Sequence, residues 1–241
     1  MTFEINASRL SMFFACPARY AFSLKWQRRA PYVAAHLKQG TNVHALMAGT
    51  EPPFDAPQPF VQNKMVEEMR LATAGYKWVG EPETKQRVRL TAGLYLNRTI
   101  DRMGTFQRRD RIVDWKTANK SWWTSMAAGT GEVISPRAMG FQAKTYLIPP
   151  DKPAPFKKAW PTLIEFVVSD GSNTTVHRYE AKPGDRQTLI DAVQLVESAT
   201  SFPAVRGYGC QWCDFFEMCF ETKGYKTKYE PLQDTYQEMD E

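Results

Sequence analysis

The sequence predicts an α/β fold. Two observations support this class: a strand–turn–strand pattern lies in the middle of the chain, and helical patterns lie on both sides of it. The 241 residues, of which 43% are hydrophobic, can bury a substantial core. We expect a single domain over residues 1–221, followed by a charged tail over residues 222–241.

The central pattern predicts a β-hairpin. Two stretches rich in β-branched, aromatic and long side chains, residues 94–105 and 111–117, flank a polar turn. If the loop is symmetric about residues 107 and 108, Asp101 lies directly opposite Asp114 on the neighbouring strand. Opposed residues share one face of a sheet, with Cβ atoms about 4.5 to 5.5 Å apart. The hairpin therefore brings two carboxylates together.

Lys116 follows Asp114 by two positions and joins it on the same face. Opposed like charges destabilise a sheet, and a buried carboxylate pair must share a proton or bind a cation. Mg²⁺ or Mn²⁺ is the natural cation, because these hard ions bind carboxylate oxygens and keep positions for water and phosphate. The alternative is a solvated strand face, on which Asp110, Asp114 and Lys116 lie beside a charged turn.

The remaining elements are predicted from hydrophobic periodicity and from turn residues. We expect helices over residues 7–25 (capped by Ser8), 38–49 (which carries His44), 61–74, 139–147 and 185–199. A proline-rich loop is expected over residues 51–59, another loop passes through Gly129 and Gly131, and a second hairpin comprises residues 162–169 and 174–180.

Four cysteines form the second informative pattern. Cys210, Cys213 and Cys219 lie in GYGCQWCDFFEMCF, and Cys16 lies in FACPARY near the other end of the chain. Such spacing suits a metal site in an intracellular protein better than disulfides between near neighbours. Four thiolates can bind zinc or an iron–sulfur cluster, and the absence of a second C-x2-C knuckle favours the cluster. The alternative is four unrelated buried cysteines.

Charge and composition leave the partner open. The net charge of +5 is compatible with nucleic acid without requiring it. Basic and aromatic residues lie together at Lys120, Trp122 and Trp123 and around Trp26, a pattern typical of nucleic-acid contacts, although buried tryptophans with nearby lysines would look the same.

The location of the protein is predicted from what the sequence lacks. No apolar run reaches the ~18 residues of a membrane span, and we find no signal-peptide pattern. We expect a soluble cytoplasmic protein without membrane contact, found in the host cytoplasm if a phage encodes it.

The order of these motifs resembles the RecB-type branch of the PD-(D/E)XK nuclease superfamily. In that branch a helix histidine precedes a G-x-x-D-R strand, a D-x-K strand and a Q-x-x-x-Y helix. The corresponding segments here are QGTNVHALM, RTIDR, IVDWKT and FQAKTY. The cysteines resemble the iron–sulfur arrangement of the AddB nuclease domain and of the CRISPR-associated RecB-like exonucleases. The chain departs from the pattern at Arg98, where a glycine is usual, and at Trp115, where a tyrosine or an aliphatic residue is usual.

The resemblance implies a restriction-endonuclease-like core, with a mixed central sheet flanked by helices. It also implies an N-terminal helical part tied to the C-terminal segment by a structural [4Fe–4S] cluster, with zinc as the alternative. The residues that it assigns to the catalytic metal, Mg²⁺ or Mn²⁺, are His44, Asp101, Asp114 and the Trp115 carbonyl. The residues that it assigns to catalysis are Asp101, Asp114, Lys116, Gln142 and Tyr146. Glu83 is a weaker candidate, better explained as a solvated charge.

The implied activity is hydrolysis of DNA phosphodiester bonds, most simply as an exonuclease on single strands or duplex ends in DNA recombination, repair or processing. No G-x-x-x-x-G-K-[ST] loop is present, so the nuclease module would act without its own helicase and could work with a recombination or helicase partner. The alternatives are a non-catalytic DNA-binding or scaffold subunit and a zinc-stapled binding domain.

Overall fold

The computed structural model describes residues 2–26, 35–117, 136–151 and 159–205, together with residues 213, 215 and 219. The helices are α1 (Ala7–Ala15), α2 (Pro17–Trp26), α3 (Ala35–Ala48), α4 (Pro59–Ala72), α6 (Pro136–Leu147) and α7 (Asp185–Glu197). The strands are β1 (Phe3–Asn6), β2 (Lys77–Val79), β3 (Thr84–Thr91), β4 (Leu94–Ile100), β5 (Arg102–Phe106), β6 (Arg109–Thr117), β7 (Leu163–Ser169) and β8 (Thr174–Glu180). The fold is therefore of the predicted α/β class.

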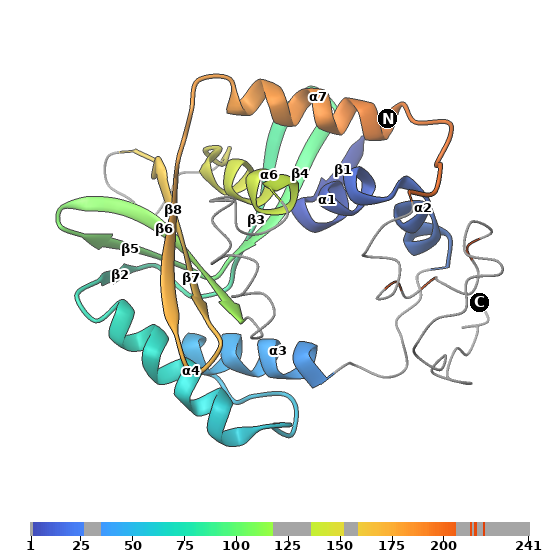
Figure 1. Cartoon of the computed structure of the whole chain (residues 1–241). Helices are drawn as coiled ribbons and strands as arrows, with labels where there is room; N and C mark the ends of the chain where they lie inside the picture. Colours follow the sequence, from blue (N-terminus) through green and yellow to red (C-terminus); the bar gives the residue numbers. More distant parts are fainter. Residues whose placement is uncertain are drawn as a thin grey trace.

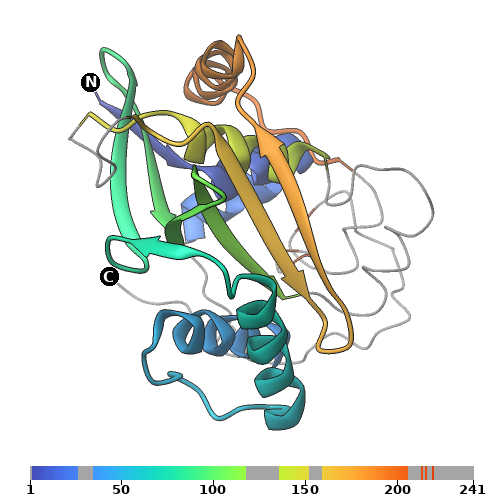
Figure 2. The same cartoon turned by 90° about the vertical axis from the view of Figure 1, so that its left-hand side faces the viewer.

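The strands form two mixed sheets. Sheet A has the order β1-β4-β3, and sheet B has the order β2-β5-β6-β7-β8. Each sheet contains one parallel pair, β1 with β4 and β6 with β7, among antiparallel ones. In both views α7 and the pair α3 and α4 lie at opposite ends of the molecule, with the strands between them (Figures 1 and 2). The expected mixed central sheet is present as two mixed sheets flanked by helices, and the chain passes directly from sheet A to sheet B at Asp101, between β4 and β5.

The predicted central hairpin has the predicted register but a shorter first strand. Arg102 pairs with Val113 and Phe106 with Arg109, so that Gln107 and Arg108 alone make the turn. Both turn residues have positive φ angles, 51° and 64°, as a two-residue type I′ turn requires. The expected single strand over residues 94–105 is divided at Asp101, since β4 and β5 pair with partners in different sheets.

The predicted N-terminal helix is two helices. Cys16 has an extended backbone between α1 and α2, because the following Pro17 disfavours the helical conformation at the residue before it. The cap is Asn6 and not Ser8: the Asn6 side chain accepts a hydrogen bond from the Arg9 N–H at 2.8 Å. The break places Cys16 at the exposed corner between the two helices.

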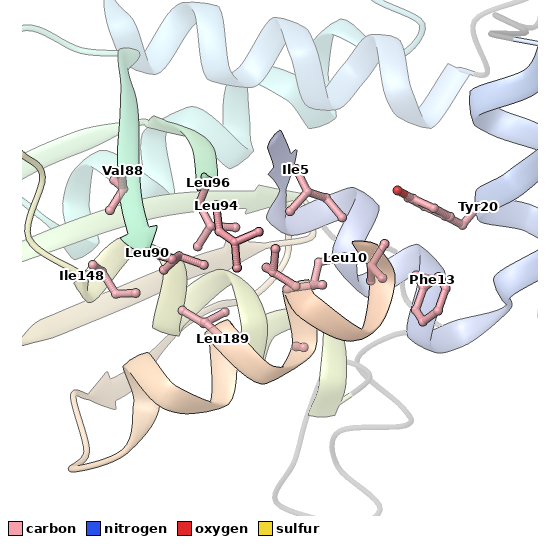
Figure 3. Close-up of a cluster of buried hydrophobic side chains, with 13 residues drawn as sticks. Ile5, Leu10, Phe13, Tyr20, Val88, Leu90, Leu94, Leu96, Ile148 and Leu189 are labelled. Atoms are coloured by element: carbon pink, nitrogen blue, oxygen red, sulfur yellow. The ribbon is translucent and has the colours of Figure 1, made fainter. Parts of the chain in front are cut away.

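Three buried clusters fill the space between the layers. Side chains from β1, β3, β4, α1, α2 and α7 converge in the first, around Leu96 and Leu189 (Figure 3). In the second, α6 packs against β6 and β7 on one face of sheet B, around Ile112 and Ile164. In the third, α3 and α4 pack against the opposite face, around Val43 and Trp115. Helix α6 thus lies between the two sheets and contacts strands of both.

The other predicted elements agree with the structure within a few residues, whereas β1, β2 and β3 were not predicted. Strand β3 alternates exposed charged residues with buried ones, and a turn at Gly93, whose φ is 88°, joins it to β4. Within the described residues, no helix is long and apolar enough to span a membrane. The expected loop through Gly129 and Gly131 and the charged tail over residues 222–241 lie outside the described residues.

The C-terminal segment returns to the N-terminal helices. The Ala18 N–H donates to the Pro203 carbonyl at 3.3 Å, and the Val205 N–H donates to Cys16 Sγ at 3.5 Å. The rings of Phe22 and Phe215 have centroids 5.6 Å apart. These contacts bring the two ends of the described chain together, as the cysteine pattern predicted.

A buried ion network crosses sheet B beneath α4. The Glu165 side chain is fully buried and accepts from Arg111 at 2.7 Å, from Arg178 at 2.8 Å and from the Tyr76 hydroxyl at 2.5 Å. The Arg111 guanidinium lies 5.2 Å from the ring centroids of both Tyr76 and Phe106, which stack on each other. The carboxylate thus has a counter-ion and several donors, which a buried charge requires.

Replacing Glu165 by glutamine should destabilise the fold. The change keeps the shape of the side chain but leaves the buried Arg111 without a counter-ion, so we expect the free energy of unfolding to fall by about 3 kcal/mol or more. Urea unfolding followed by circular dichroism measures this. Glu180→Gln is the matched control, because it breaks only the exposed pair with Arg109 and should leave the midpoint unchanged. Equal midpoints for Glu165→Gln and wild type would contradict the role of the network.

Candidate active site

Asp101 occupies the bend between the two sheets and is buried, with 6% of its surface exposed. Its Oδ2 accepts a hydrogen bond from the Trp115 N–H at 2.7 Å, across the hairpin. Its carbonyl accepts from the Glu83 N–H at 3.1 Å. The extension of the β5–β6 register places Asp101 opposite Asp114, as predicted. The bend therefore fixes the first carboxylate by both its side chain and its backbone.

Asp114 lies on the face of β6 that α6 covers, and it is 1% exposed. Lys116, two residues further along the same face, forms an ion pair with its Oδ2. The Gln142 amide on α6 donates to its Oδ1 at 3.0 Å and to the Tyr146 hydroxyl at 2.9 Å. One helical turn separates Gln142 from Tyr146, so both reach the same point from one helix face.

His44 and Glu83 complete the group from other elements. His44 Nδ1 on α3 lies 3.3 Å from Asp101 Oδ2 and 3.6 Å from Glu83 Oε1. Glu83 has a φ of 52°, an uncommon conformation for a residue with a side chain. Such backbone conformations persist where the surrounding structure imposes them, often at functional sites. Glu83 is exposed, as expected for a solvated charge, but it also lies beside His44, because the unpredicted strand β3 begins directly after it.

The electrostatics of the group favour an added positive charge. Burial opposes protonation of His44, but its hydrogen bonds to Asp101 and Glu83 raise its pKa to about 10. Burial raises the pKa of Asp114 to about 6 against the opposing effect of Lys116, and the nearby Asp101 adds to the rise. For Lys116 the attraction of Asp114 and Asp101 outweighs burial and raises its pKa. His44, Asp114 and Lys116 thus all respond to neighbouring carboxylates.

The donor set fits a divalent cation. His44, Glu83 and Asp101 each offer one ligand atom, and these atoms all lie within 4.8 Å of one another. Carboxylate oxygens suit Mg²⁺ and Mn²⁺, and imidazole is compatible with Mn²⁺. A divalent ion would replace the positive charge that the protonated His44 supplies.

The structure also explains the arginine that departs from the resemblance. Arg98 is buried, and its Nη1 donates to the carbonyls of Thr145, Tyr146 and Ile148 at the C-terminal end of α6. Its Nε and Nη2 donate to Gln86 Oε1 at 2.9 and 2.6 Å. Burial lowers its pKa to about 9, so the side chain stays charged at neutral pH. A cation at this end of a helix satisfies orphan carbonyls and interacts favourably with the helix dipole.

The predicted site residues have four different outcomes. His44, Asp101, Asp114, Lys116, Gln142 and Tyr146 are brought together around the bend. The Trp115 side chain packs against α3 and α4 on the opposite face, while its N–H binds Asp101. Lys120, Trp122, Trp123 and Cys210 lie outside the described residues. The three described cysteines, Cys16, Cys213 and Cys219, are not joined by disulfides, and they do not form a group with ligand atoms within 4.8 Å of one another.

Comparison with known protein families identifies the superfamily to which the chain belongs. Residues 4–220, nearly the whole chain, match the family profile described as PD-(D/E)XK nuclease superfamily. The chain belongs to this superfamily. The superfamily predicted from the motifs is therefore confirmed, and the group around Asp101 and Asp114 is the candidate active site of a PD-(D/E)XK protein.

Several solved structures are similar to this PD-(D/E)XK protein. SSO0001 has a TM-score of 0.48 and is 13% identical, with 90% of this chain and 85% of that chain covered. LHK-Exo in complex with dAMP has a TM-score of 0.46 and is 13% identical, with 80% and 86% covered. The alkaline exonuclease LHK-Exo from Laribacter hongkongensis has a TM-score of 0.46 and is 13% identical, with 81% and 86% covered. No curated protein sequence matches the chain.

Replacing Arg98 by methionine should destabilise this PD-(D/E)XK protein. The change removes the donors for three carbonyls at the end of α6, so we expect the free energy of unfolding to fall by about 2 to 4 kcal/mol, measured by urea unfolding. Arg89→Met, at an exposed position of β3, is the matched control and should unfold like the wild type. A wild-type midpoint for Arg98→Met would show that α6 does not depend on this side chain.

Proposed function

We propose that this protein is a metal-dependent nuclease that hydrolyses phosphodiester bonds of DNA. One observation carries the proposal: two buried carboxylates, Asp101 and Asp114, lie beside Lys116 in the lining of a cleft of about 570 Å³, and His44 contacts Asp101. Membership of the PD-(D/E)XK nuclease superfamily supports it. A module with a purely structural role gains nothing from opposing two buried carboxylates, because like charges destabilise a sheet.

The cation would be Mg²⁺ or Mn²⁺, held by His44, Asp101, Asp114 and the Trp115 carbonyl, with Glu83 as an additional ligand. When bound, such an ion lowers the pKa of water and offsets charge that develops on the phosphate. The buried carboxylates and the mixed oxygen and nitrogen donors support this assignment.

The protein's own side chains prepare the rest of the reaction. Lys116 would orient the attacking water and offset negative charge on the phosphate oxygens in the transition state. Gln142 donates to Asp114 and so holds the carboxylate in place, and we propose that it also positions the phosphate or the attacking water together with Tyr146. Burial, together with the carboxylates of Asp114 and Asp101, raises the pKa of Tyr146 well above its ordinary value, so its hydroxyl keeps its proton.

The substrate class that fits best is DNA, cut from single-stranded or duplex ends by an exonuclease in recombination, repair or processing. Lys120, Trp122 and Trp123 follow β6 directly in the sequence, so the predicted DNA contacts are close to Lys116 along the chain. A recombination or helicase protein would be a suitable partner, and a cytoplasmic location would suit this role.

A non-catalytic DNA-binding or scaffold subunit is the second candidate. It would keep the fold and need no complete catalytic group. The ion pair of Lys116 with Asp114 and the Gln142 hydrogen bond favour catalysis, because both contacts fix groups on the side of β6 that borders the cleft.

We further propose that Cys16, Cys210, Cys213 and Cys219 bind a structural [4Fe–4S] cluster, with zinc as the alternative, in line with the RecB-type branch. The contacts of Val205 with Cys16 and of Phe215 with Phe22 support a closure of the chain at this point. A cluster here would stabilise the junction between the N-terminal helices and the C-terminal segment.

The nuclease proposal predicts cleavage that depends on both metal and Lys116. Anaerobically purified protein should digest end-labelled single- or double-stranded DNA with Mg²⁺ or Mn²⁺ and not with EDTA. Lys116→Ala should lose about a hundredfold or more in rate, because the charge that stabilises the transition state is removed. Gel analysis of the labelled products measures both effects.

The control is Lys64→Ala, an exposed lysine of α4 that should cleave like the wild type. Equal cleavage by the Lys116→Ala protein would indicate a contaminating nuclease, and absence of cleavage with every metal and substrate would move the scaffold function ahead.

The cluster proposal predicts a brown protein with broad visible absorbance when it is purified without oxygen. Cys213→Ala should lose the colour and bound iron, unfold at a lower temperature and lose activity only as a consequence. Iron and zinc analysis together with thermal unfolding measures this. A stable, colourless and fully active Cys213→Ala protein would overturn the cluster proposal. Stoichiometric zinc in the wild-type protein would show that the cysteines bind zinc, the alternative metal, and not an iron–sulfur cluster.

A further inference from the structure

The face of sheet A that points away from the hydrophobic core is polar and basic. Side chains alternate along a strand, so on β4 this face carries Tyr95, Asn97 and Thr99 and then reaches Asp101 at the bend. Their neighbours on β3 in the observed register are, in the same order, Arg89, Arg87 and Lys85. A ladder of basic residues thus runs along β3 and ends beside a catalytic carboxylate.

The cleft joins this face to the candidate active site. Its lining includes Asp101, Asp114 and Lys116 of the candidate site together with Lys85 and Arg87 of β3. A single cavity of about 570 Å³ therefore contains both groups. A molecule that reacts at the carboxylates can therefore extend along β3 without leaving the cleft.

The two basic side chains of β3 in the cleft, Lys85 and Arg87, can each bind an anion, but in different ways. Lys85 is exposed and has no ion pair or hydrogen bond to its side chain within the described part of the chain. The Arg87 guanidinium lies over the Tyr95 ring, 3.7 Å from its centroid, and pairs with Glu4. Half of the Arg87 side chain stays exposed, so it can bind a further anion while the ring fixes its orientation.

We propose that Lys85 and Arg87 bind the phosphodiester backbone of the DNA strand on one side of the cleaved bond. This inference rests on the proposed function and assigns a substrate-binding surface to the same cleft. Phosphates carry most of the affinity of proteins for nucleic acid, and lysine and arginine are their usual partners. The proposed ligand is the backbone and not the bases, because the residues nearest the carboxylates are cationic and polar, whereas the aromatic Tyr95 lies outside the cleft under Arg87.

The binding test uses full-length protein and a labelled single-stranded oligonucleotide in EDTA, where no cleavage occurs. Lys85→Gln and Arg87→Gln should each raise the Kd about three- to tenfold and lower the slope of log K against log salt by about 0.7. Lys64→Gln and Arg70→Gln on α4 are the matched controls, because they remove the same charges from exposed positions outside the cleft. Wild-type affinity in both cleft variants, or equal losses in the controls, would overturn the inference.

Two further readouts separate a backbone contact from other roles. In Mg²⁺, the cleft variants should raise the KM with little change in kcat, since they lie away from the reacting atoms. A methylphosphonate linkage removes the charge of one phosphate. At the phosphate that Lys85 or Arg87 contacts, this change should weaken binding by the wild type but not by the variant that already lacks the contact. A loss that follows base sequence instead would overturn the assignment to phosphate.

The same experiments distinguish failure of the nuclease function from failure of the proposed binding surface. If the wild type cleaves no DNA with any metal but Lys85→Gln still weakens binding, the nuclease function fails and the binding surface stands. If the wild type cleaves and both cleft variants bind and cleave normally, the nuclease function stands and the surface is refuted.

Discussion

The candidate site depends on the burial of two carboxylates at the bend where the chain passes from one sheet to the other. Asp101 and Asp114 are almost fully buried, and a buried charge without partners is strongly unfavourable. The protein supplies those partners from four directions: the Trp115 N–H, His44 on α3, Lys116 on the same strand and Gln142 on α6. Burial is therefore tolerated because these partners supply positive charge and hydrogen-bond donors to both carboxylates.

Other parts of the structure keep these partners in place. Arg98 binds the last carbonyls of α6, the helix that presents Gln142 and Tyr146, and so connects sheet A to the helix that fixes Asp114. On the other face of sheet B, Glu165 and Arg111 join β6 to β7 beneath α4. Both interactions are buried and charged, so each requires a full set of partners. Neither interaction contacts the carboxylates directly. A substitution in either would change the position of Asp101 or Asp114 through α6 or β6.

The departure from the superfamily motif has a structural explanation. Where the resemblance expects a small glycine, Arg98 fills the space between β4, α6 and Trp160, with its guanidinium 4.7 Å from the ring centroid. The same strand also lines the cleft, through Asn97, Arg98 and Thr99. One strand thus supports α6 and borders the proposed DNA-binding surface, and it ends just before Asp101.

The sequence alone determined the features that arise from short-range rules. Side-chain alternation and a two-residue turn specified the register that opposes Asp101 and Asp114, and helical periodicity placed Gln142 and Tyr146 on one face. The ordered motifs also indicated the superfamily. Only the tertiary structure decided that the strand is divided at Asp101, that β3 brings Glu83 to His44, and that Arg98 binds the end of α6. These features depend on pairing between segments far apart in the chain, and local patterns of hydrophobicity carry no information about which distant strand or carbonyl will lie alongside.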